Sequence, residues 1–341
     1  MKAAVYRGRG DVRIESVPEP DAPGRDEVVL AVTRGAICGT DASEWKHGPL
    51  LARPPVTLGH EFTGRVVAVG AGVEELTPGD RVVSGAGISC GRCDHCRRGR
   101  TNLCSQYATL GLHVNGGLAE LVTSPASICL PVPAGCSDEA AAMAQPFAVA
   151  LHATRRAAVE AGSSCVVIGV GGIGMFIVAA AVAHGAAPLI AVDVDDRRLE
   201  IARGLGAHAT VDARDVDPLA AVAELTGGGA EIAIEASGSP QGLELALSAA
   251  GKGARIVLVG LQSAPRELDV FSLAVREVEV VGTLAHVCAV DLPEALQLLA
   301  TTRLAQSVLD RVIPLDALVE DGLRPLAEGT ARGKIVVDVT A

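Results

Sequence analysis

The chain has 341 residues, more than one ordinary hydrophobic core holds, so we expect two domains. Hydrophobic residues make up 49% of it and charged residues 20%, which is typical of a folded globular protein and argues against disorder. The net charge of −11 argues against nucleic acid or an anionic membrane surface as a partner.

Residues 1–147 contain short runs typical of β-strands, such as EVVLAVT and FTGRVVAVG, separated by glycine and proline. These short β-type runs, separated by turn residues, predict a β-rich module with long loops. No stretch reaches about 18 unbroken apolar residues, as a membrane span requires. The first residues, MKAAVYRGRG, lack the apolar core of a secretory signal, so we expect a cytoplasmic protein.

From residue 148 to 286, short apolar strands alternate with Ala- and Leu-rich helical stretches. SCVVIGV precedes GGIGMFIVAAAVAHG, and PLIAVDV precedes DDRRLEIARGLG. This alternation predicts a parallel, doubly wound sheet. Residues 287–341 are expected to return and complete the first module. The predicted fold class is therefore α/β, with a doubly wound domain joined to a β-rich domain.

The stretch GVGGIG at residues 169–174 follows an apolar strand directly and opens a helix. In this setting Gly169 permits a tight turn, Gly171 lets a pyrophosphate approach the backbone, and Gly174 lets helix and strand pack closely. The helix N-terminus then offers N–H groups and a positive dipole to the phosphates. The pattern predicts a dinucleotide site rather than a glycine-rich turn that binds nothing.

Asp193 ends the next strand, about 20 residues beyond the turn, where an acid binds the adenosine ribose 2′-hydroxyl. A carboxylate there repels a 2′-phosphate, so NAD is favoured over NADP. Arg198 lies nearby and fits either stacking on adenine or recruitment to a 2′-phosphate, which leaves NADP as the alternative.

Four cysteines follow the pattern C-x2-C-x2-C-x7-C in CGRCDHCRRGRTNLC: Cys90, Cys93, Cys96 and Cys104. Two-residue gaps let successive thiolates turn onto one ion, and four thiolates close a tetrahedral structural zinc site. Disulfides and an iron–sulfur cluster are the alternatives.

A second candidate metal site lies outside that run. Cys38 and His60 supply a sulfur and a nitrogen ligand, while a catalytic zinc takes about three protein ligands and keeps one open position. Glu61, in LGHEFTG, and Gln145, in MAQPFAVALHA, are the candidates for the third.

Several further motifs occur in order along the chain: ICGTD, PVTLGHEFTG, PGDRV, GGLAE, AQPFAVALHA, AVREVEVVG and the closing KIVV. Together with the cysteine run and GVGGIG, they resemble the zinc-dependent medium-chain dehydrogenase/reductases of the alcohol dehydrogenase superfamily over nearly the whole chain. The resemblance is greatest to the sorbitol, butanediol and threonine dehydrogenase branch. It implies a GroES-like catalytic domain (1–147 and 287–341) and a Rossmann domain (148–286).

The resemblance also implies a role for each site residue. Cys38 and His60 match catalytic zinc ligands, and Glu61 matches the acid that ligates or backs the zinc. Gln145 stands where relatives usually carry glutamate. Thr40 matches the hydroxyl that takes the alcohol proton. Further cofactor contacts are implied at Gly172, Ile173, Ser237, Val259, Leu261 and Leu284.

Two places depart from the family pattern. Many relatives carry a proton-relay histidine where this chain has Ser43, so we expect His47 or water to take that role. Polyol-binding relatives carry an aromatic residue and an arginine where this chain has Leu284 and Ala285. Their loss predicts a more apolar substrate than a sugar alcohol.

The predicted function is zinc-dependent hydride transfer between NAD(H) and a secondary alcohol or vicinal diol, or the corresponding ketone. The cofactors are NAD, one catalytic zinc and one structural zinc. The alternatives are polyol or L-threonine oxidation, a reductase, and a non-catalytic protein that binds nucleotide and zinc. A homodimer or homotetramer is expected, paired through the candidate edge strand 277–282.

Overall fold

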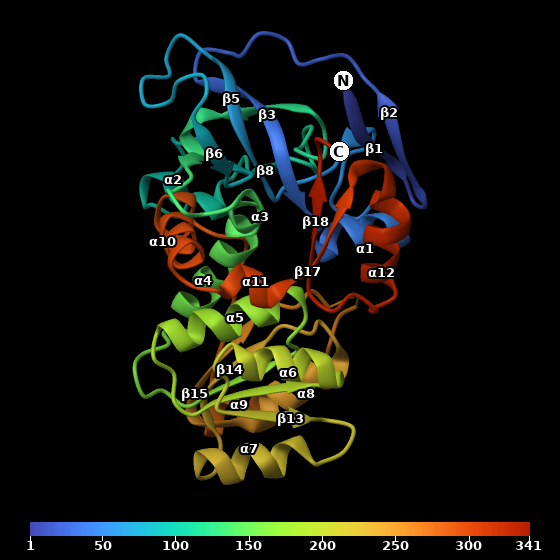
Figure 1. Cartoon of the computed structure of the whole chain (residues 1–341). Helices are drawn as coiled ribbons and strands as arrows, with labels where there is room; N and C mark the ends of the chain where they lie inside the picture. The colour runs from blue at the N-terminus through green and yellow to red at the C-terminus, as the bar shows by residue number, and fades with distance from the viewer. Residues whose placement is uncertain (263) are drawn as a thin grey trace. The chain divides into compact units, whose positions relative to one another are not determined.

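The computed structural model describes residues 1–262 and 264–341 of the chain. It divides into two compact units (Figure 1). The first unit comprises Met1–Ala148 and His286–Ala341, and the second comprises Val149–Ala285. The N-terminal and C-terminal segments of the sequence therefore build one unit together.

Within the described residues, the first unit is built on a seven-stranded sheet with the path β10-β6-β5-β3-β18-β17, and β9 pairs with β3. Its strands are β3 (Glu27–Ala36), β5 (Phe62–Val69), β6 (Arg81–Ser84), β9 (Leu121–Pro125), β10 (Cys129–Pro131), β17 (Leu309–Pro314) and β18 (Lys334–Asp338). The C-terminal strand β18 runs antiparallel to β3 and parallel to β17, so it closes the sheet between early and late segments.

Two smaller sheets complete the strands of this unit. One has the order β2-β1-β4, and the other pairs β7 with β8. Their bounds are β1 (Lys2–Gly8), β2 (Asp11–Ser16), β4 (Val56–Thr57), β7 (Gly87–Ile88) and β8 (Ala108–Thr109). Buried side chains from these sheets, among them Tyr6, Leu30 and Phe62, form one hydrophobic core.

Short helices connect the strands of the first unit. They are α1 (Gly39–His47), α2 (Asp94–Arg97), α3 (Asp138–Ala142), α10 (Cys288–Thr301), α11 (Leu304–Val308), α12 (Arg324–Ala327), the 3₁₀ turns η1 (Thr101–Leu103), η2 (Ala126–Ile128) and η3 (Leu315–Ala317), and a π-helix (Leu318–Leu323). The chain passes into the second unit within α4 (Ala144–Ala157).

Over its described residues, the second unit has a six-stranded parallel sheet with the order β13-β12-β11-β14-β15-β16. The strands are β11 (Cys165–Ile168), β12 (Leu189–Asp193), β13 (Ala209–Asp212), β14 (Ala230–Glu235), β15 (Ala250–Leu258) and β16 (Glu279–Gly282). The order reverses between β11 and β14, which is the topological switch point where doubly wound sheets bind ligands.

Helices alternate with these strands: α5 (Gly172–Ala183), α6 (Asp196–Gly204), α7 (Pro218–Thr226), α8 (Pro240–Ala249) and α9 (Val270–Val275). Four of them begin with side-chain caps, because Asp195, Asp217, Ser239 and Asp269 accept backbone N–H groups of the first turn. Most of the buried side chains in the β-strands between them are apolar, as expected of a parallel sheet covered on its faces.

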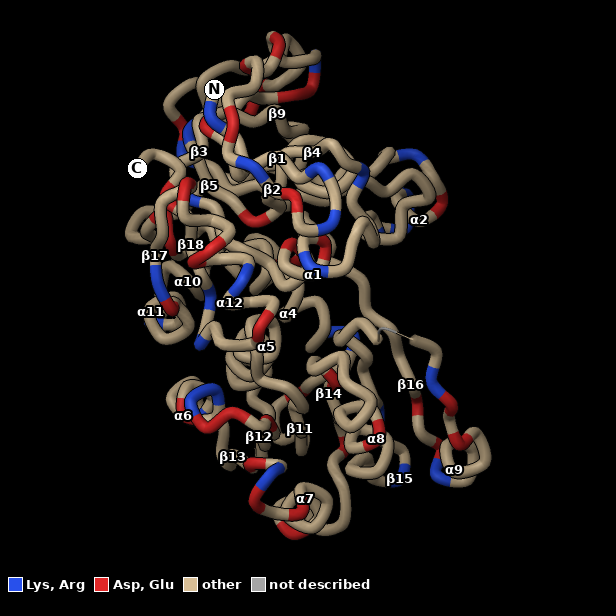
Figure 2. Tube along the Cα trace, turned by 90° about the vertical axis from the view of Figure 1, so that its right-hand side faces the viewer, with Lys and Arg blue, Asp and Glu red and all other residues tan. Residues whose placement is uncertain are grey.

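The strand β16 ends the sheet, so one of its edges has no strand partner among the described residues. Figure 2 shows β16 and α9 at one margin of the second unit. The α9 side chains of Val270, Phe271 and Val275 are all exposed there. In the described part of the chain, no helix combines the length and the apolar character that crossing a membrane requires.

Candidate active site and metal centres

Cys38 lies at the N-cap of helix α1, where the chain leaves β3. Its backbone N–H donates to the Asp41 carboxylate at 3.0 Å, which closes a capping box and fixes the first turn. Thr40 is the second residue of the helix, and its Oγ1 lies 3.6 Å from Cys38 Sγ. The cap therefore holds the sulfur and the hydroxyl side by side.

His60 and Glu61 lie between β4 and β5, directly after a turn at Gly59. Gly59 has a φ of +102°, and a Cβ there would lie 2.5 Å from the Leu118 backbone nitrogen, so only glycine fits. The Ala36 N–H donates to the Glu61 carbonyl at 2.7 Å. This bond ties the pair to the end of β3, just before Cys38.

The ligand atoms of Cys38, His60 and Glu61 lie within 4.8 Å of one another. Both His60 and Glu61 are buried, at 6% and 1% exposure. His60 Nδ1 and Glu61 Oε1 have no hydrogen-bond partner among the described residues. A sulfur, a nitrogen and a carboxylate oxygen that converge in this way fit a zinc ion.

Asp41 adds negative charge to this group, because it is fully buried and its Oδ1 lies 3.6 Å from His60 Nδ1. Burial alone would lower the pKa of His60, but the Asp41 carboxylate and the Cys38 thiolate outweigh it and raise this pKa to about 10. An environment that favours a proton on the imidazole also favours a metal cation. The sequence reasoning missed Asp41, although an acid three residues after a helix cap is a recognisable signal.

Lys334, on β18, reaches the same group from the far end of the sequence. Its ammonium forms an ion pair with the Glu61 carboxylate and donates to the Ile37 carbonyl at 2.9 Å. Both side chains of the pair are almost fully buried. The Lys334 charge therefore offsets the charge of Glu61 inside the unit.

The other residues expected at this site lie on two helices. Gln145 is the second residue of α4 and is buried. Ser43 and His47 are exposed on α1, three and seven residues after Thr40, which places all three on one helix face. Seven residues of α-helix rise about 10 Å, so transfer from Thr40 to His47 needs an intermediate group such as water.

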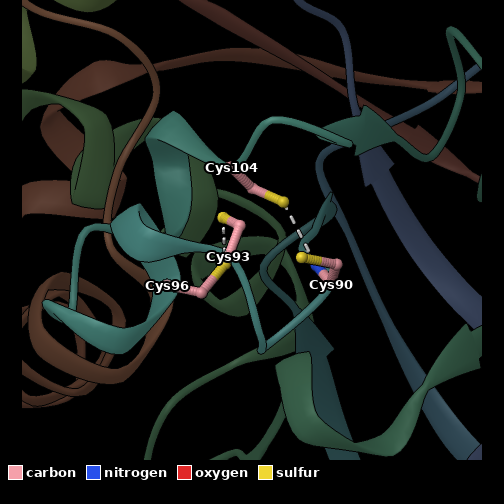
Figure 3. Close-up of side chains that lie close together, drawn as sticks. All are labelled: Cys90, Cys93, Cys96 and Cys104. Carbon is pink, nitrogen blue, oxygen red and sulfur yellow. Dashed lines mark hydrogen bonds between the residues drawn. The ribbon is translucent and has the colours of Figure 1, made fainter.

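The four cysteines of the run converge in a lobe around α2 (Figure 3). Their sulfur atoms lie within 4.8 Å of one another, and none of the chain's nine cysteines, all of them described, forms a disulfide. The Cys90 N–H donates to Cys104 Sγ at 3.2 Å. Hydrogen bonding from the Cys96 backbone is the main cause that lowers the pKa of the Cys93 thiol to about 5. Thiolates in this arrangement fit a closed structural zinc site.

In the second unit, the glycine turn joins β11 to α5. Gly169 has a φ of +84°, and a Cβ on Gly174 would lie 1.9 Å from the Gly169 carbonyl oxygen. Gly171 caps α5, and a Cβ on Gly172 would meet no atom within 4 Å. Open space at the N-terminus of a twelve-residue helix fits the pyrophosphate of a dinucleotide.

Asp193 ends β12 beside this turn. Its Oδ2 accepts the Val170 N–H at 2.7 Å, and its Oδ1 accepts the N–H groups of Val194 at 2.7 Å and Asp195 at 3.1 Å. Because a carboxylate has about four acceptor positions, one remains for a ribose hydroxyl. Arg198 Nη1 lies 3.7 Å from the Cβ position of Gly171.

The remaining cofactor residues expected from the sequence lie on the second unit. Ile173 is the second residue of α5, while the others follow the carboxyl ends of β14, β15 and β16: Ser237, Val259, Leu261 and Leu284. Ser237 lies against the glycine turn, since a Cβ on Gly169 would be 2.6 Å from its backbone nitrogen. The residues after β14 and the turn after β11 thus meet at the switch point.

Two family models match the chain in the order of this architecture. The alcohol dehydrogenase GroES-like domain matches residues 24–134, and the zinc-binding dehydrogenase model matches residues 172–301. The chain is a zinc-type medium-chain dehydrogenase. It is an oxidoreductase of the alcohol dehydrogenase superfamily, in the sorbitol and butanediol dehydrogenase branch, with zinc and a nicotinamide nucleotide as cofactors.

Its relatives match it over almost the whole length. Sorbitol dehydrogenase of Bacillus subtilis is 34% identical and covers 88% of this chain and 86% of its own. The crystal structure of 2R,3R-butanediol dehydrogenase from the same species has a TM-score of 0.90 at 32% identity, with 99% of both chains covered. A zinc-binding dehydrogenase of Sinorhizobium meliloti 1021, bound to NADP, has a TM-score of 0.90 at 31% identity and covers 99% of this chain and 98% of its own.

Proposed function

We propose that the protein transfers hydride between NAD(H) and a secondary alcohol or vicinal diol, or the corresponding ketone. The observation that carries this proposal is the convergence of the Cys38, His60 and Glu61 ligand atoms beside the Thr40 hydroxyl. A zinc ion held there would supply a Lewis acid for the substrate oxygen, and a bound NAD would supply the hydride acceptor.

The residues of the chain have three tasks in this reaction. Cys38 and His60 hold the metal, and Glu61 either completes the ligand set or leaves that place to Gln145. Asp41 orients the His60 ring, as carboxylates next to metal-bound histidines commonly do. Lys334 is paired with the Glu61 carboxylate and so limits the negative charge at the site.

Thr40 is placed to take the proton that the alcohol loses, because its hydroxyl adjoins the metal-binding sulfur of Cys38. The proton then leaves along the exposed face of α1. Ser43 lies one turn beyond Thr40, and His47 lies one turn further, at the end of the helix. We assign the relay to water held along this face, with His47 as its outer acceptor.

The fixed carboxylate of Asp193 favours NAD over NADP. Its carboxylate is fixed by three backbone N–H groups and lies where the adenosine ribose binds. A 2′-phosphate there would meet a fixed negative charge. Because one relative binds NADP, the preference should be measured by comparing the KM values for NAD and NADP.

A vicinal diol such as butane-2,3-diol is favoured over a sugar alcohol. Leu284 and Ala285 stand after β16, where polyol-binding relatives carry an aromatic residue and an arginine, and neither offers a side-chain hydrogen bond. The butanediol dehydrogenase relative is consistent with such a substrate. Leu110 and Leu118 are buried in the core of the first unit and contribute to packing there.

A homodimer is proposed through the open edge of β16. Pairing this edge with its copy about a two-fold axis would join the two sheets, with the paired β16 strands antiparallel, and satisfy unpaired backbone groups. The exposed apolar side chains of α9 would gain burial in the same contact.

The decisive experiment measures zinc per chain in protein purified without chelators, for wild type and Cys38→Ala. We expect two zinc ions in wild type and one in the variant, with oxidation of butane-2,3-diol lost. One zinc in both proteins, unchanged by added zinc, would refute the catalytic site. Faster turnover of sorbitol than of butane-2,3-diol or apolar secondary alcohols would refute the substrate assignment.

A further inference from the structure

Glu235 is a buried acid that none of the chemistry described so far uses. It is the last residue of β14, at the carboxyl end of the strand beside the switch point, and it is 1% exposed. A charged side chain is seldom buried this deeply unless its hydrogen bonds are well satisfied. The question is therefore what its carboxylate holds.

Its carboxylate holds the loop that follows β14. Glu235 Oε1 accepts the backbone N–H groups of Ser237 at 2.8 Å and Gly238 at 2.9 Å, and it also accepts the Ser237 hydroxyl. Oε2 has no hydrogen-bond partner among the described residues. One oxygen thus fixes the turn of residues 236–239.

The main chain of Glu235 holds a second loop. Its carbonyl accepts the N–H groups of Val259 at 2.8 Å and Gly260 at 3.0 Å, just after β15. The two loops touch, because a Cβ on Gly260 would lie 2.2 Å from the Gly238 nitrogen and 2.6 Å from Glu235 Oε2. Glu235 therefore ties the loops after β14 and β15 into one rigid group.

This group forms one half of the dinucleotide site. A dinucleotide spans the switch point, with its adenosine over the β12 side, where Asp193 lies. Its other half extends over β14 and β15. We propose that Glu235 is a positioning residue for the nicotinamide half of the cofactor, acting through the loops 236–239 and 259–260. This inference rests on the proposed binding of NAD.

The test separates the two halves of the cofactor. AMP carries only the adenosine half, whereas NADH carries both. In Glu235→Ala we expect the Kd for NADH, followed by nicotinamide fluorescence, to rise about tenfold or more. The Kd for AMP, measured by calorimetry, should stay within about twofold. Glu235→Gln keeps an acceptor at Oε1 and should bind NADH within about threefold of wild type.

Glu231→Ala is the matched control. Glu231 lies near the opposite end of the same strand. Its carboxylate accepts hydrogen bonds from the Ser164 N–H at 2.7 Å and from the Ser164 hydroxyl at 3.0 Å. Its loss should leave the ratio of the two Kd values unchanged. If Glu235→Ala does not fold, Glu235→Asp keeps the charge but shortens the reach, and the same selective loss of NADH is expected.

Equal weakening of AMP and NADH binding would overturn the inference, because it would mean that Glu235 only stabilises the unit. Unchanged NADH binding in both Glu235→Ala and Glu235→Asp would overturn it as well. Failure of the wild-type protein to bind AMP and NADH would instead refute the proposed nucleotide site itself, and this inference with it.

Discussion

The ammonium of Lys334 and the carboxylate of Glu61, one of the candidate metal ligands, form a buried ion pair. Lys334 also donates to the carbonyl of Ile37, the residue that precedes Cys38. One side chain therefore supports the backbone at the first ligand and balances the charge of the third.

Replacing Lys334 with methionine should destabilise the protein, because it leaves Glu61 buried without its counter-charge. The expected loss in free energy of unfolding is about 3–5 kcal/mol without zinc. Zinc bound beside Glu61 should restore part of it, so urea titrations with and without added zinc should differ more for Lys334→Met than for wild type. Lys2→Met, which removes an exposed pair with Asp316, is the control and should cost about 1 kcal/mol or less in both conditions.

Replacing Thr40 with valine should slow catalysis without disturbing the metal. Valine keeps the shape of the side chain but has no hydroxyl to receive the alcohol proton, so we expect kcat to fall about 10²- to 10⁴-fold. Zinc per chain and the Kd for NADH should stay at wild-type values. Ser43→Ala serves as the comparison, and an equal loss of kcat in both variants would contradict the special placement of Thr40 beside Cys38.

Replacing Cys93 with serine should remove one zinc ion and loosen the lobe of residues 90–104. Four thiolates close the structural site, so the loss of one ligand leaves a weak, incomplete site. We expect limited proteolysis to cut within the lobe in the variant and not in wild type. Cys136→Ser, outside the lobe, should change neither zinc content nor cleavage. Retention of both zinc ions in Cys93→Ser would argue against a four-thiolate site.

Acid should unfold the first unit partly through the start of α3. Burial alone would raise the pKa values of Asp138 and Glu139, but hydrogen bonds outweigh it, chiefly from Thr33 and Arg81 to Asp138 and from the Glu139 backbone and Arg34 to Glu139. Both pKa values thus lie below their usual range, so the stabilisation is complete above about pH 5 and is lost as the pH falls through the lowered values. Asp138→Asn should reduce the free energy of unfolding at pH 7, and the difference from wild type should shrink as the pH falls through the lowered pKa of Asp138.

The measurement for this prediction is urea unfolding at a series of pH values. Asp21→Asn, at an exposed position, should give a curve that coincides with wild type. An offset between Asp138→Asn and wild type that stays constant as the pH falls would show that the charge of Asp138 in its ion pair with Arg81 is not the source of the difference.

Replacing Phe271 with aspartate should convert the proposed dimer to a monomer. Phe271 is 77% exposed on α9, close in sequence to the open edge strand β16, and a charge there would have to be desolvated on pairing. Light scattering coupled to gel filtration would report the mass. Val312→Asp, at an exposed apolar position of the first unit, is the control and should leave the mass unchanged. A wild-type monomer would refute the dimer directly.

The local motifs were the most predictable parts of the fold and site. The strand, glycine turn and helix around GVGGIG, the acid at the end of β12 and the clustered cysteines all follow from short spacings in the sequence. Their geometry is set by neighbouring residues, so no tertiary information is needed. The strand near residues 277–282 was also predicted at the sheet edge, because it is the last strand in the series of alternating strands and helices.

Contacts between distant segments could not be predicted in this way. From the sequence, Lys334 was a candidate partner for Glu61 or another buried acid, with a surface lysine as the simpler interpretation. The observed pair with Glu61 depends on β18 lying beside β3. Glu235 has the same character, because its hydrogen bonds belong to loops after two different strands. A π-helix over Leu318–Leu323 leads directly into α12, where Pro325 lacks the N–H that a continuous α-helical ladder needs.

The strand β18, which brings Lys334 to Glu61, is made long after the ligands it supports. The second unit is one continuous segment and can fold while β18 is still being synthesised. At a synthesis rate of about 5–20 residues per second, Lys334 is added to the chain on the order of ten seconds or more after Glu61. During that interval β3 lacks its β18 neighbour, and a zinc ion captured early by Cys38 and His60 would neutralise the acid in its place.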